Sequence, residues 1–375
     1  MTECRPGSIT ELGRILAGLQ PASALLVTGG ESYRRSGASE VVEPLLAQLT
    51  VERVAGVVPN PALDQVEEVI EALRRSSPDV VLAVGGGSVI DVTKAARGLA
   101  HVADPTEAVR SGTPPDPPAV PPLVAVPTTA GTGSEATHFA VVYIDGVKNS
   151  VGHPSFRPEH VVLDPELTRS LPARTTAETG LDALAQAMES MWSTRSNEES
   201  LGHARTALEL AWTNIEAAAE TGAIEHRTAM CRAAHLSGRA IDVSRTTAAH
   251  ALSYRLTTRY GVAHGHAVAL FLGAVLEHNA GVTERDCTDP RGVDFVQARI
   301  GEVLRVLDVE DPAGGRRALT SLLERLGLET GLAAVGVGTP AERRALAEHA
   351  DPVRQETNPR ALDPQRLAEL IERLA

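Results

Sequence analysis

Residues 79–95 read DVVLAVGGGSVIDVTKA and combine a strand, a glycine turn and the start of a helix. Residues 79–84 are almost continuously apolar, which is typical of a strand buried on both faces of a parallel sheet. Glycines at 85–87 let the backbone approach a ligand, and free N–H groups at a helix start favour phosphate. Because the spacing is not GxGxxG, the stretch predicts either a phosphate-binding loop or a tight turn without a ligand.

A second loop of the same kind follows the apolar run at 123–126. Residues 128–134 read TTAGTGS, which is rich in hydroxyls and glycines. Two such loops at the carboxyl ends of strands favour a cofactor crevice. Further strands are expected at 24–27, 51–58, 141–149 and 160–164, with helical spacing between several of them. The alternation predicts a doubly wound α/β domain over residues 1–172.

The pattern changes after residue 172, where strand signals end. Residues 173–375 read as a series of helices and predict a separate all-helical domain. The expected helices are 177–192, 198–220, 226–243, 248–256, 266–280, 295–307, 316–326, 340–349 and 363–374.

Composition limits the classes of function. The formal charge of −13 argues against a nucleic-acid partner, although a small anionic substrate needs only a few local cations. No apolar run is long enough to cross a bilayer, and the first residues lack the layout of a secretory leader. Three widely spaced cysteines fit a reducing compartment, so we expect a cytoplasmic protein of two domains.

Residues 246–279 concentrate four histidines in an apolar helical pattern, with a break at Gly261. In an earlier helix, Asp182 and Gln186 stand four residues apart and therefore share one helix face. Together with His250 and His264 they would form a mixed nitrogen and oxygen set that suits Zn²⁺ or Fe²⁺. The alternative is an exposed polar pair and ordinary interior or surface histidines, which is the interpretation we prefer for His278.

The turn after the first strand bears on the cofactor. Residues 28–35 read TGGESYRR and offer hydroxyls and two arginines, which favours NADPH. Glu31 provides an alternative, because an acidic side chain at such a turn can hold the ribose hydroxyls of NADH. Arg34 and Arg35 would then be ordinary surface residues.

Several motifs, in order along nearly the whole chain, resemble the iron-containing (group III) alcohol dehydrogenase family. They are VGGGSVIDVTKA at 84–95, PTTAGTGSEAT at 127–137, LDPELT at 163–168, GLDAL at 180–184, the His250 and His264 segment, and RQETNPR at 354–360. The resemblance implies hydride transfer between a nicotinamide cofactor and an alcohol or aldehyde, assisted by a divalent metal. Family analogy also implies a homodimer.

Two positions depart from the family pattern. Gln186 stands where a histidine ligand is usual, and Tyr254 stands where many members have a further histidine. Both departures, with the residues around them, are similar to the subgroup that reduces phosphonoacetaldehyde to 2-hydroxyethylphosphonate in phosphonate biosynthesis. The metal ligands implied are Asp182, Gln186, His250 and His264.

The resemblance also implies roles for other residues. Tyr254 or His266 would relay the proton to the alkoxide, unless water does so. For the anionic substrate group we expect His138, Arg255 or Arg259, although Arg255 and Arg259 are equally well explained as surface residues. The residues expected to bind the cofactor are Gly86, Gly87, Ser88, Asp91, Thr128, Thr129, Thr132 and Lys148.

Three alternatives stay open from the sequence. The chain could reduce another short aldehyde or a hydroxy acid. It could be a lyase of the dehydroquinate-synthase-like fold, which would turn over without net loss of NADPH. It could also be a metal-free binding protein, given Gln186.

Overall fold

The parallel sheet of the first unit is formed by the apolar runs of the sequence. The structure, a computed structural model, describes residues 3–374, and the chain divides into two compact units, Met1–Leu171 and Pro172–Ala375. In the first unit five parallel strands have the order β2-β1-β3-β4-β7. Their bounds are β1 Ser23–Gly29, β2 Thr50–Val57, β3 Val80–Gly85, β4 Leu123–Pro127 and β7 His160–Val161.

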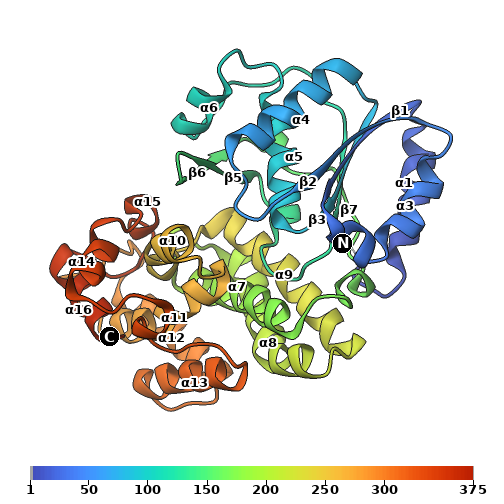
Figure 1. Cartoon of the computed structure of the whole chain (residues 1–375). Helices are drawn as coiled ribbons and strands as arrows, with labels where there is room; N and C mark the ends of the chain where they lie inside the picture. The colour runs from blue at the N-terminus through green and yellow to red at the C-terminus, as the bar shows by residue number, and fades with distance from the viewer. Residues whose placement is uncertain (1–2, 375) are drawn as a thin grey trace. The chain divides into compact units, whose positions relative to one another are not determined.

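Successive residues of the central strands point to opposite faces of this sheet, and each face has its own core. Leu25, Val81 and Ala125 pack into one apolar cluster with α4 (Leu63–Ser76) and α5 (Gly87–Leu99). Leu26 and Leu82 pack into the other, with α1 (Glu11–Leu19) and α3 (Ala38–Leu46). Figure 1 shows the two helix pairs on opposite sides of the strands. The expected α/β fold with helices on both sheet faces is confirmed.

The β segment expected at 141–149 is an antiparallel hairpin that does not join the main sheet. Strands β5 (Phe139–Ile144) and β6 (Val147–Gly152) are joined by a tight turn in which Asp145 and Gly146 both have positive φ, 52° and 76°. The sequence pattern did not separate the two strands. Short elements complete the unit, namely α2 (Glu31–Arg35), α6 (Pro105–Ser111) and four 3₁₀ turns at Ser8–Thr10, Ser134–Ala136, Pro154–Phe156 and Pro165–Thr168.

The second unit is helical throughout, as expected, and is built around α7 (Ala173–Trp192). From Gly180 to Trp192 every residue of α7 is buried, so this helix is surrounded by others. None of the helices in the described part of the chain has the length and apolarity needed to cross a membrane. The others are α8 Glu198–Glu220, α9 Ile224–Ser244, α10 Ala248–Tyr260, α11 His264–Ala280, α12 Val293–Val306, α13 Pro312–Arg325, α14 Pro340–Glu348, α15 Pro352–Gln355 and α16 Pro364–Glu372, with a 3₁₀ turn at Ala333–Val335.

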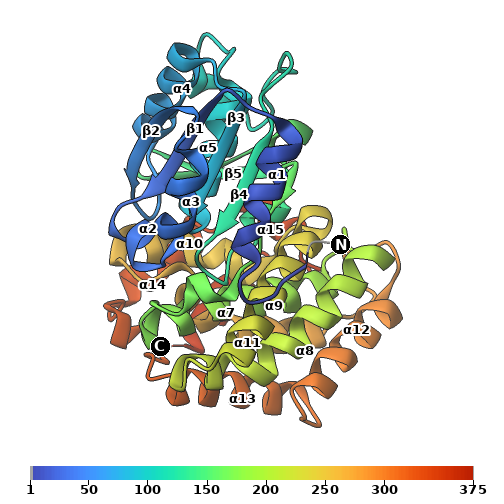
Figure 2. The same ribbon diagram turned by 90° about the vertical axis from the view of Figure 1, so that its right-hand side faces the viewer.

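The turn between α10 and α11 brings two histidine-bearing helices together. Helix α10 ends at Tyr260 and is capped by Gly261, whose φ of 69° is readily adopted by glycine and whose N–H donates to the Leu256 carbonyl. Only Val262 and Ala263 separate this glycine from α11, so the two helices are close neighbours in space (Figure 2). The break expected near Gly261 is therefore where the chain reverses.

Candidate metal and cofactor sites

Three of the four expected metal ligands meet inside the helical unit. Asp182 on α7, His250 on α10 and His264 on α11 each present a ligand atom, and these atoms all lie within 4.8 Å of one another. The His250 Nε2 is 3.4 Å from an Asp182 carboxylate oxygen, and the two imidazole centroids are 5.4 Å apart. Asp182 and His250 are buried and His264 is half-buried. Donor groups from three different helices thus converge on one point.

Gly265 makes this convergence possible. A Cβ at this position would lie 2.0 Å from the Glu178 carbonyl oxygen and 2.8 Å from the Asp182 backbone nitrogen. Any larger residue would push the first turn of α11 away from α7. The glycine between the two histidines at 264 and 266 therefore sets how closely the His264 ring approaches Asp182.

Glu189 fixes the orientation of His250. This fully buried carboxylate accepts hydrogen bonds from the Thr247 hydroxyl (2.6 Å), the Ala249 N–H (2.8 Å) and the His250 Nδ1. Burial would raise the pKa of Glu189, but the contacts with His250 and Thr247 lower it below its usual value. Because Nδ1 donates to the carboxylate, Nε2 is the nitrogen that faces Asp182.

No role was assigned to Glu189 from the sequence, although a signal was present. It follows Asp182 by seven residues and Gln186 by three, which places all three on one face of α7. A carboxylate at that spacing in an apolar helix needs a buried partner.

Gln186 lies one turn from Asp182 and is also buried. Its side-chain oxygen accepts a hydrogen bond of 3.0 Å from the Ser237 hydroxyl of α9. An amide oxygen has two lone pairs and can therefore accept from a hydroxyl and bind a cation at the same time. The neighbouring Asp182, His250 and His264 provide one carboxylate and two imidazoles, and with Gln186 the chemistry of this donor set fits Fe²⁺ or Zn²⁺.

Tyr254 and His266 occupy different sides of the α10–α11 pair. The Tyr254 ring lies 6.1 Å from that of His264, and burial raises the pKa of its hydroxyl while Arg354 opposes the rise. His266 is two residues beyond His264, about 200° around α11. It is buried and donates from Nε2 to the Glu329 carbonyl at 2.8 Å. Tyr254 therefore adjoins the donor set, and His266 faces the segment at Glu329.

The cations expected to hold an anionic group are dispersed. Arg255 is half-buried and five residues beyond His250, about 140° away around α10. Arg259 is exposed at the last turn, where its charge helps lower the pKa of Glu342 after the contacts of that carboxylate with Thr339. His138 belongs to the first unit, where its ring packs edge-on against Phe139 at 5.8 Å.

The two glycine-containing loops of the first unit lie against each other, as expected for a cofactor crevice. A Cβ on Gly87 would meet the Thr132 hydroxyl at 2.4 Å, and one on Gly86 would meet Thr129 at 3.3 Å. The Thr128 N–H donates to the Gly85 carbonyl at 2.9 Å. Ser88 follows in the first turn of α5, so the expected loop residues are gathered around one helix N-terminus.

Asp91, on α5, connects this helix to the second loop. Its carboxylate accepts hydrogen bonds from the Ser134 hydroxyl (2.5 Å) and the Val141 N–H (3.1 Å) and lies 3.4 Å from the buried Lys94 ammonium. These contacts tie α5 to the second loop and to β5. Lys148, the remaining expected cofactor residue, pairs with Tyr143 across the β5–β6 hairpin.

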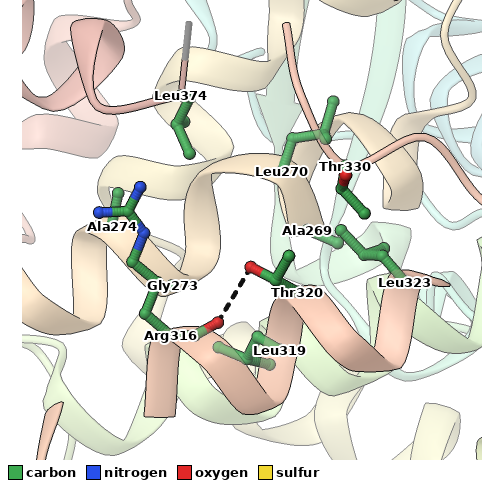
Figure 3. A pocket seen from close by; sticks show the side chains of 10 residues that line it. All are labelled: Ala269, Leu270, Gly273, Ala274, Arg316, Leu319, Thr320, Leu323, Thr330 and Leu374. Carbon is green, nitrogen blue, oxygen red and sulfur yellow. Dashed lines mark hydrogen bonds between the residues drawn. The ribbon is translucent and has the colours of Figure 1, made fainter. Parts of the chain in front are cut away.

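A small pocket elsewhere in the helical unit has a structural explanation. It lies between α11 and α13 beside Gly273, where the Arg316 side chain crosses the glycine (Figure 3). The Thr320 hydroxyl donates to the Arg316 carbonyl at 3.1 Å, and the Arg316 guanidinium bonds Glu277 at 3.1 Å. The lining is mostly aliphatic, and we assign no ligand to it.

Comparison with known proteins agrees with these features. Residues 2–165 match the family model "Iron-containing alcohol dehydrogenase", and residues 176–375 match "Fe-containing alcohol dehydrogenase family, C-terminal". A phosphonoacetaldehyde reductase of Streptomyces viridochromogenes is 40% identical over 82% of this chain and 79% of its own length. A choline dehydrogenase of Bacillus subtilis is 37% identical over 73% of this chain and 69% of its own length.

Solved structures give the same result for the fold. A sulfoacetaldehyde reductase from Bifidobacterium kashiwanohense, in complex with NAD⁺, superposes with a TM-score of 0.89. The match covers 100% of this chain and 97% of that one, at 28% identity.

The α/β unit with paired loops and the buried carboxylate and imidazole cluster define an oxidoreductase of the metal-assisted dehydrogenase class. The chain belongs to the iron-containing alcohol dehydrogenase family. The resemblance stated from the sequence motifs is thereby confirmed.

Proposed function

We propose that the protein reduces phosphonoacetaldehyde to 2-hydroxyethylphosphonate with NADPH. The carbonyl carbon gains a hydride and the oxygen gains a proton, so one aldehyde, one NADPH and one proton give one alcohol and one NADP⁺. The observation that carries this proposal is the 40% identity over 82% of the chain to a phosphonoacetaldehyde reductase. The buried Asp182, His250 and His264 cluster supports a metal-assisted reaction.

Each part of the site has a separate task. When bound, the divalent ion supplies Lewis-acid polarisation of the aldehyde oxygen, and the reduced nicotinamide supplies the hydride. Asp182, Gln186, His250 and His264 would hold the ion, and Glu189 orients His250 so that its Nε2 faces Asp182. The loop residues would hold the dinucleotide, namely Gly86, Gly87, Ser88, Thr128, Thr129 and Thr132. Asp91 positions these loops, and Lys148, by resemblance to the family, would contact the ribose next to the nicotinamide.

Tyr254 donates the proton. Its ring lies 6.1 Å from that of His264, and the raised pKa of its hydroxyl keeps it protonated at neutral pH. A neutral phenol beside a cation can donate as the alkoxide forms. His266 is the alternative donor that the family resemblance implies, and its Nε2 is engaged with the Glu329 carbonyl.

The cofactor preference rests on α2. Arg34 and Arg35 are both exposed in this short helix after β1, where they are available to a 2′-phosphate, whereas Glu31 would favour NADH. Because one solved relative is in complex with NAD⁺, a preference for NADH is the competing outcome. We further propose a cytoplasmic location, because Cys4, Cys231 and Cys287 form no disulfide within the described residues, which is compatible with a reducing compartment. By analogy with the family we propose a homodimer.

The test is NADPH oxidation by the metal-reconstituted enzyme with phosphonoacetaldehyde, sulfoacetaldehyde, acetaldehyde and propanal, repeated with NADH. We expect kcat/KM to be highest for phosphonoacetaldehyde by at least about tenfold, a difference of roughly 1.4 kcal/mol in transition-state stabilisation. A preference for acetaldehyde or propanal would overturn the substrate assignment and leave the family unaffected. A preference for sulfoacetaldehyde would move the assignment to sulfonates, the substrate class named for the solved relative.

A further inference from the structure

Three segments of the helical unit meet at the start of α10, the helix that carries His250. The Ser193 hydroxyl, after α7, donates to the Ser244 carbonyl at the end of α9 (2.5 Å). The Thr194 N–H donates to the Thr357 carbonyl, after α15, at 3.0 Å, and the Thr357 hydroxyl donates to the Thr246 carbonyl at 2.6 Å. α15 also packs beside α10 (Figure 1). Each of the three segments carries one arginine: Arg195, Arg245 and Arg354.

Arg245 is held in a backbone conformation that side chains disfavour. It caps the C-terminus of α9 with φ 60° and ψ 174°, a region occupied almost only by glycine. Its N–H donates to the Ile241 carbonyl, and its own carbonyl accepts from the Ser244 hydroxyl, both at 3.0 Å. A glycine here would remove the strain, so the arginine side chain is kept at a cost. Such residues concentrate at functional sites.

Arg354 is buried beside Tyr254. It is only 8% exposed, and its guanidinium and the Tyr254 hydroxyl are hydrogen-bonding partners. Tyr254 in turn lies 6.1 Å from the His264 ring. A single side chain therefore separates this permanently charged group from the donor cluster.

The positive charges of Arg195 and Arg354 act on Arg245 and add to the effect of burial in lowering its pKa. Burial and then the charges of Arg354 and Arg195 lower the pKa of Arg245 to about 10, and Asp242 only partly opposes them. Asp351 and Glu189 are the acidic neighbours of Arg354. Burial would lower the pKa of Arg354, but with Tyr254 these carboxylates raise it, so Arg354 stays charged. Like charges gathered in a half-buried place favour a bound anion. The protein as a whole carries −13, so the gathering of three arginines in one place is not a consequence of its composition.

We propose that Arg245 and Arg354 bind the phosphonate group of the substrate, with the exposed Arg195 at the rim. The assignment rests on the proposed function. Only one methylene separates the aldehyde carbon from phosphorus, so a carbonyl held at the donor cluster places its phosphonate close to the neighbouring arginines. Guanidinium groups match phosphonate oxygens with paired, charge-assisted hydrogen bonds. Two such groups favour a phosphonate dianion over a sulfonate monoanion.

The test uses Arg245→Gly and Arg354→Lys in the metal-reconstituted enzyme. Arg245→Gly removes the guanidinium and also the backbone strain, so folding is preserved. Arg354→Lys keeps the buried charge and loses the paired donors. We expect kcat/KM for phosphonoacetaldehyde to fall about 10- to 100-fold in each variant. For acetaldehyde it should change by less than about threefold in Arg245→Gly. Arg354→Lys also changes the partner of Tyr254, so that variant is judged by the ratio of kcat/KM for phosphonoacetaldehyde to kcat/KM for acetaldehyde, which should fall about tenfold or more. Arg232→Ala, on the exposed face of α9, is the matched control.

A binding measurement separates this proposal from the proposed function. Methylphosphonate should raise the melting temperature of the wild type and not of the two variants, and methanesulfonate should raise it less. If the wild type prefers phosphonoacetaldehyde and both variants keep that preference, the arginine assignment is overturned and the proposed function stands. Loss of preference in Arg255→Ala or Arg259→Ala instead would also overturn it. If the wild type shows neither preference nor thermal shift, the proposed function fails, and this assignment fails with it.

Discussion

Glu189 determines which imidazole nitrogen of His250 faces Asp182. Of the carboxylates near the donor cluster, Asp182 lies beside His250 Nε2 and Glu189 bonds Nδ1, so the two imidazole nitrogens have different partners. Burial would lower the pKa of His250, but Glu189 and Asp182 together raise it. A proton and a metal cation compete for the nitrogen of this imidazole, so a carboxylate that changes its basicity also changes its metal affinity.

Replacing Glu189 by glutamine tests this role. The amide keeps the size of the side chain and removes the charge that holds His250, so we expect the affinity for Zn²⁺ or Fe²⁺ to fall about 10- to 100-fold. The measurement is competition with a chromophoric chelator, which does not depend on turnover. Glu209→Gln, on the exposed face of α8, is the control and should leave the affinity unchanged. An unaltered affinity in Glu189→Gln would show that the carboxylate does not support the metal site.

At the scale of elements, the site depends on how closely α11 approaches α7. Gly265→Ala would place a methyl group 2.0 Å from the Glu178 carbonyl oxygen. We expect a loss of about 1–3 kcal/mol in the free energy of unfolding, with weakened metal binding as His264 moves away from Asp182. Urea denaturation and chelator competition measure the two effects.

Gly202→Ala provides the comparison for this change. Gly202 lies in α8, and an added Cβ would meet nothing within 4 Å. Alanine should therefore stabilise the helix by roughly 0.5–1 kcal/mol, because glycine loses more backbone entropy on folding. If both substitutions stabilise the protein, close contact between α7 and α11 does not limit the size of residue 265.

The elements near the site could be predicted from the sequence where a local pattern specifies them. Apolar runs and glycine turns gave β3, β4 and the two loops, and the spacing of Asp182 and Gln186 placed both on one face of α7. Helix ends were less accurate, since α10 continues to Tyr260 and α11 already begins at His264. His264 is thus the first helical residue, which aims it towards α7.

Other parts of the site are set by tertiary contacts, which leave no local pattern. Arg354 is 100 residues from Tyr254 in the sequence, and the hydrogen bond of Thr357 to Thr246 brings its segment to α10. The positive φ of Arg245 also has no sequence signal, because non-glycine residues rarely adopt it. Arg255 and Arg259 follow Tyr254 closely in the sequence. They were therefore the arginines expected to bind the anionic group of the substrate.

At the scale of the whole molecule, the two ligand sites are built from different units. The loops that contact one another around α5 belong to Met1–Leu171, and the donor cluster belongs to Pro172–Ala375. Ligands that bind only the folded state stabilise it by mass action. A metal ion should therefore stabilise the helical unit directly and leave the conformation of the two nucleotide-binding loops unchanged.

Metal removal tests this separation in the full chain. After dialysis against a strong chelator, we expect aldehyde reduction to be lost and the melting temperature to fall, since saturation at 100 times Kd contributes about 2.7 kcal/mol. The Kd for NADPH, followed by the fluorescence of the nicotinamide, should change by less than about threefold, because α5 and its two loops contain none of the proposed metal ligands. Adding Zn²⁺ or Fe²⁺ should restore the melting temperature and the activity together. A tenfold or greater loss of NADPH affinity on chelation would instead require the metal to organise the dinucleotide site, and the two sites would then have to be treated as coupled.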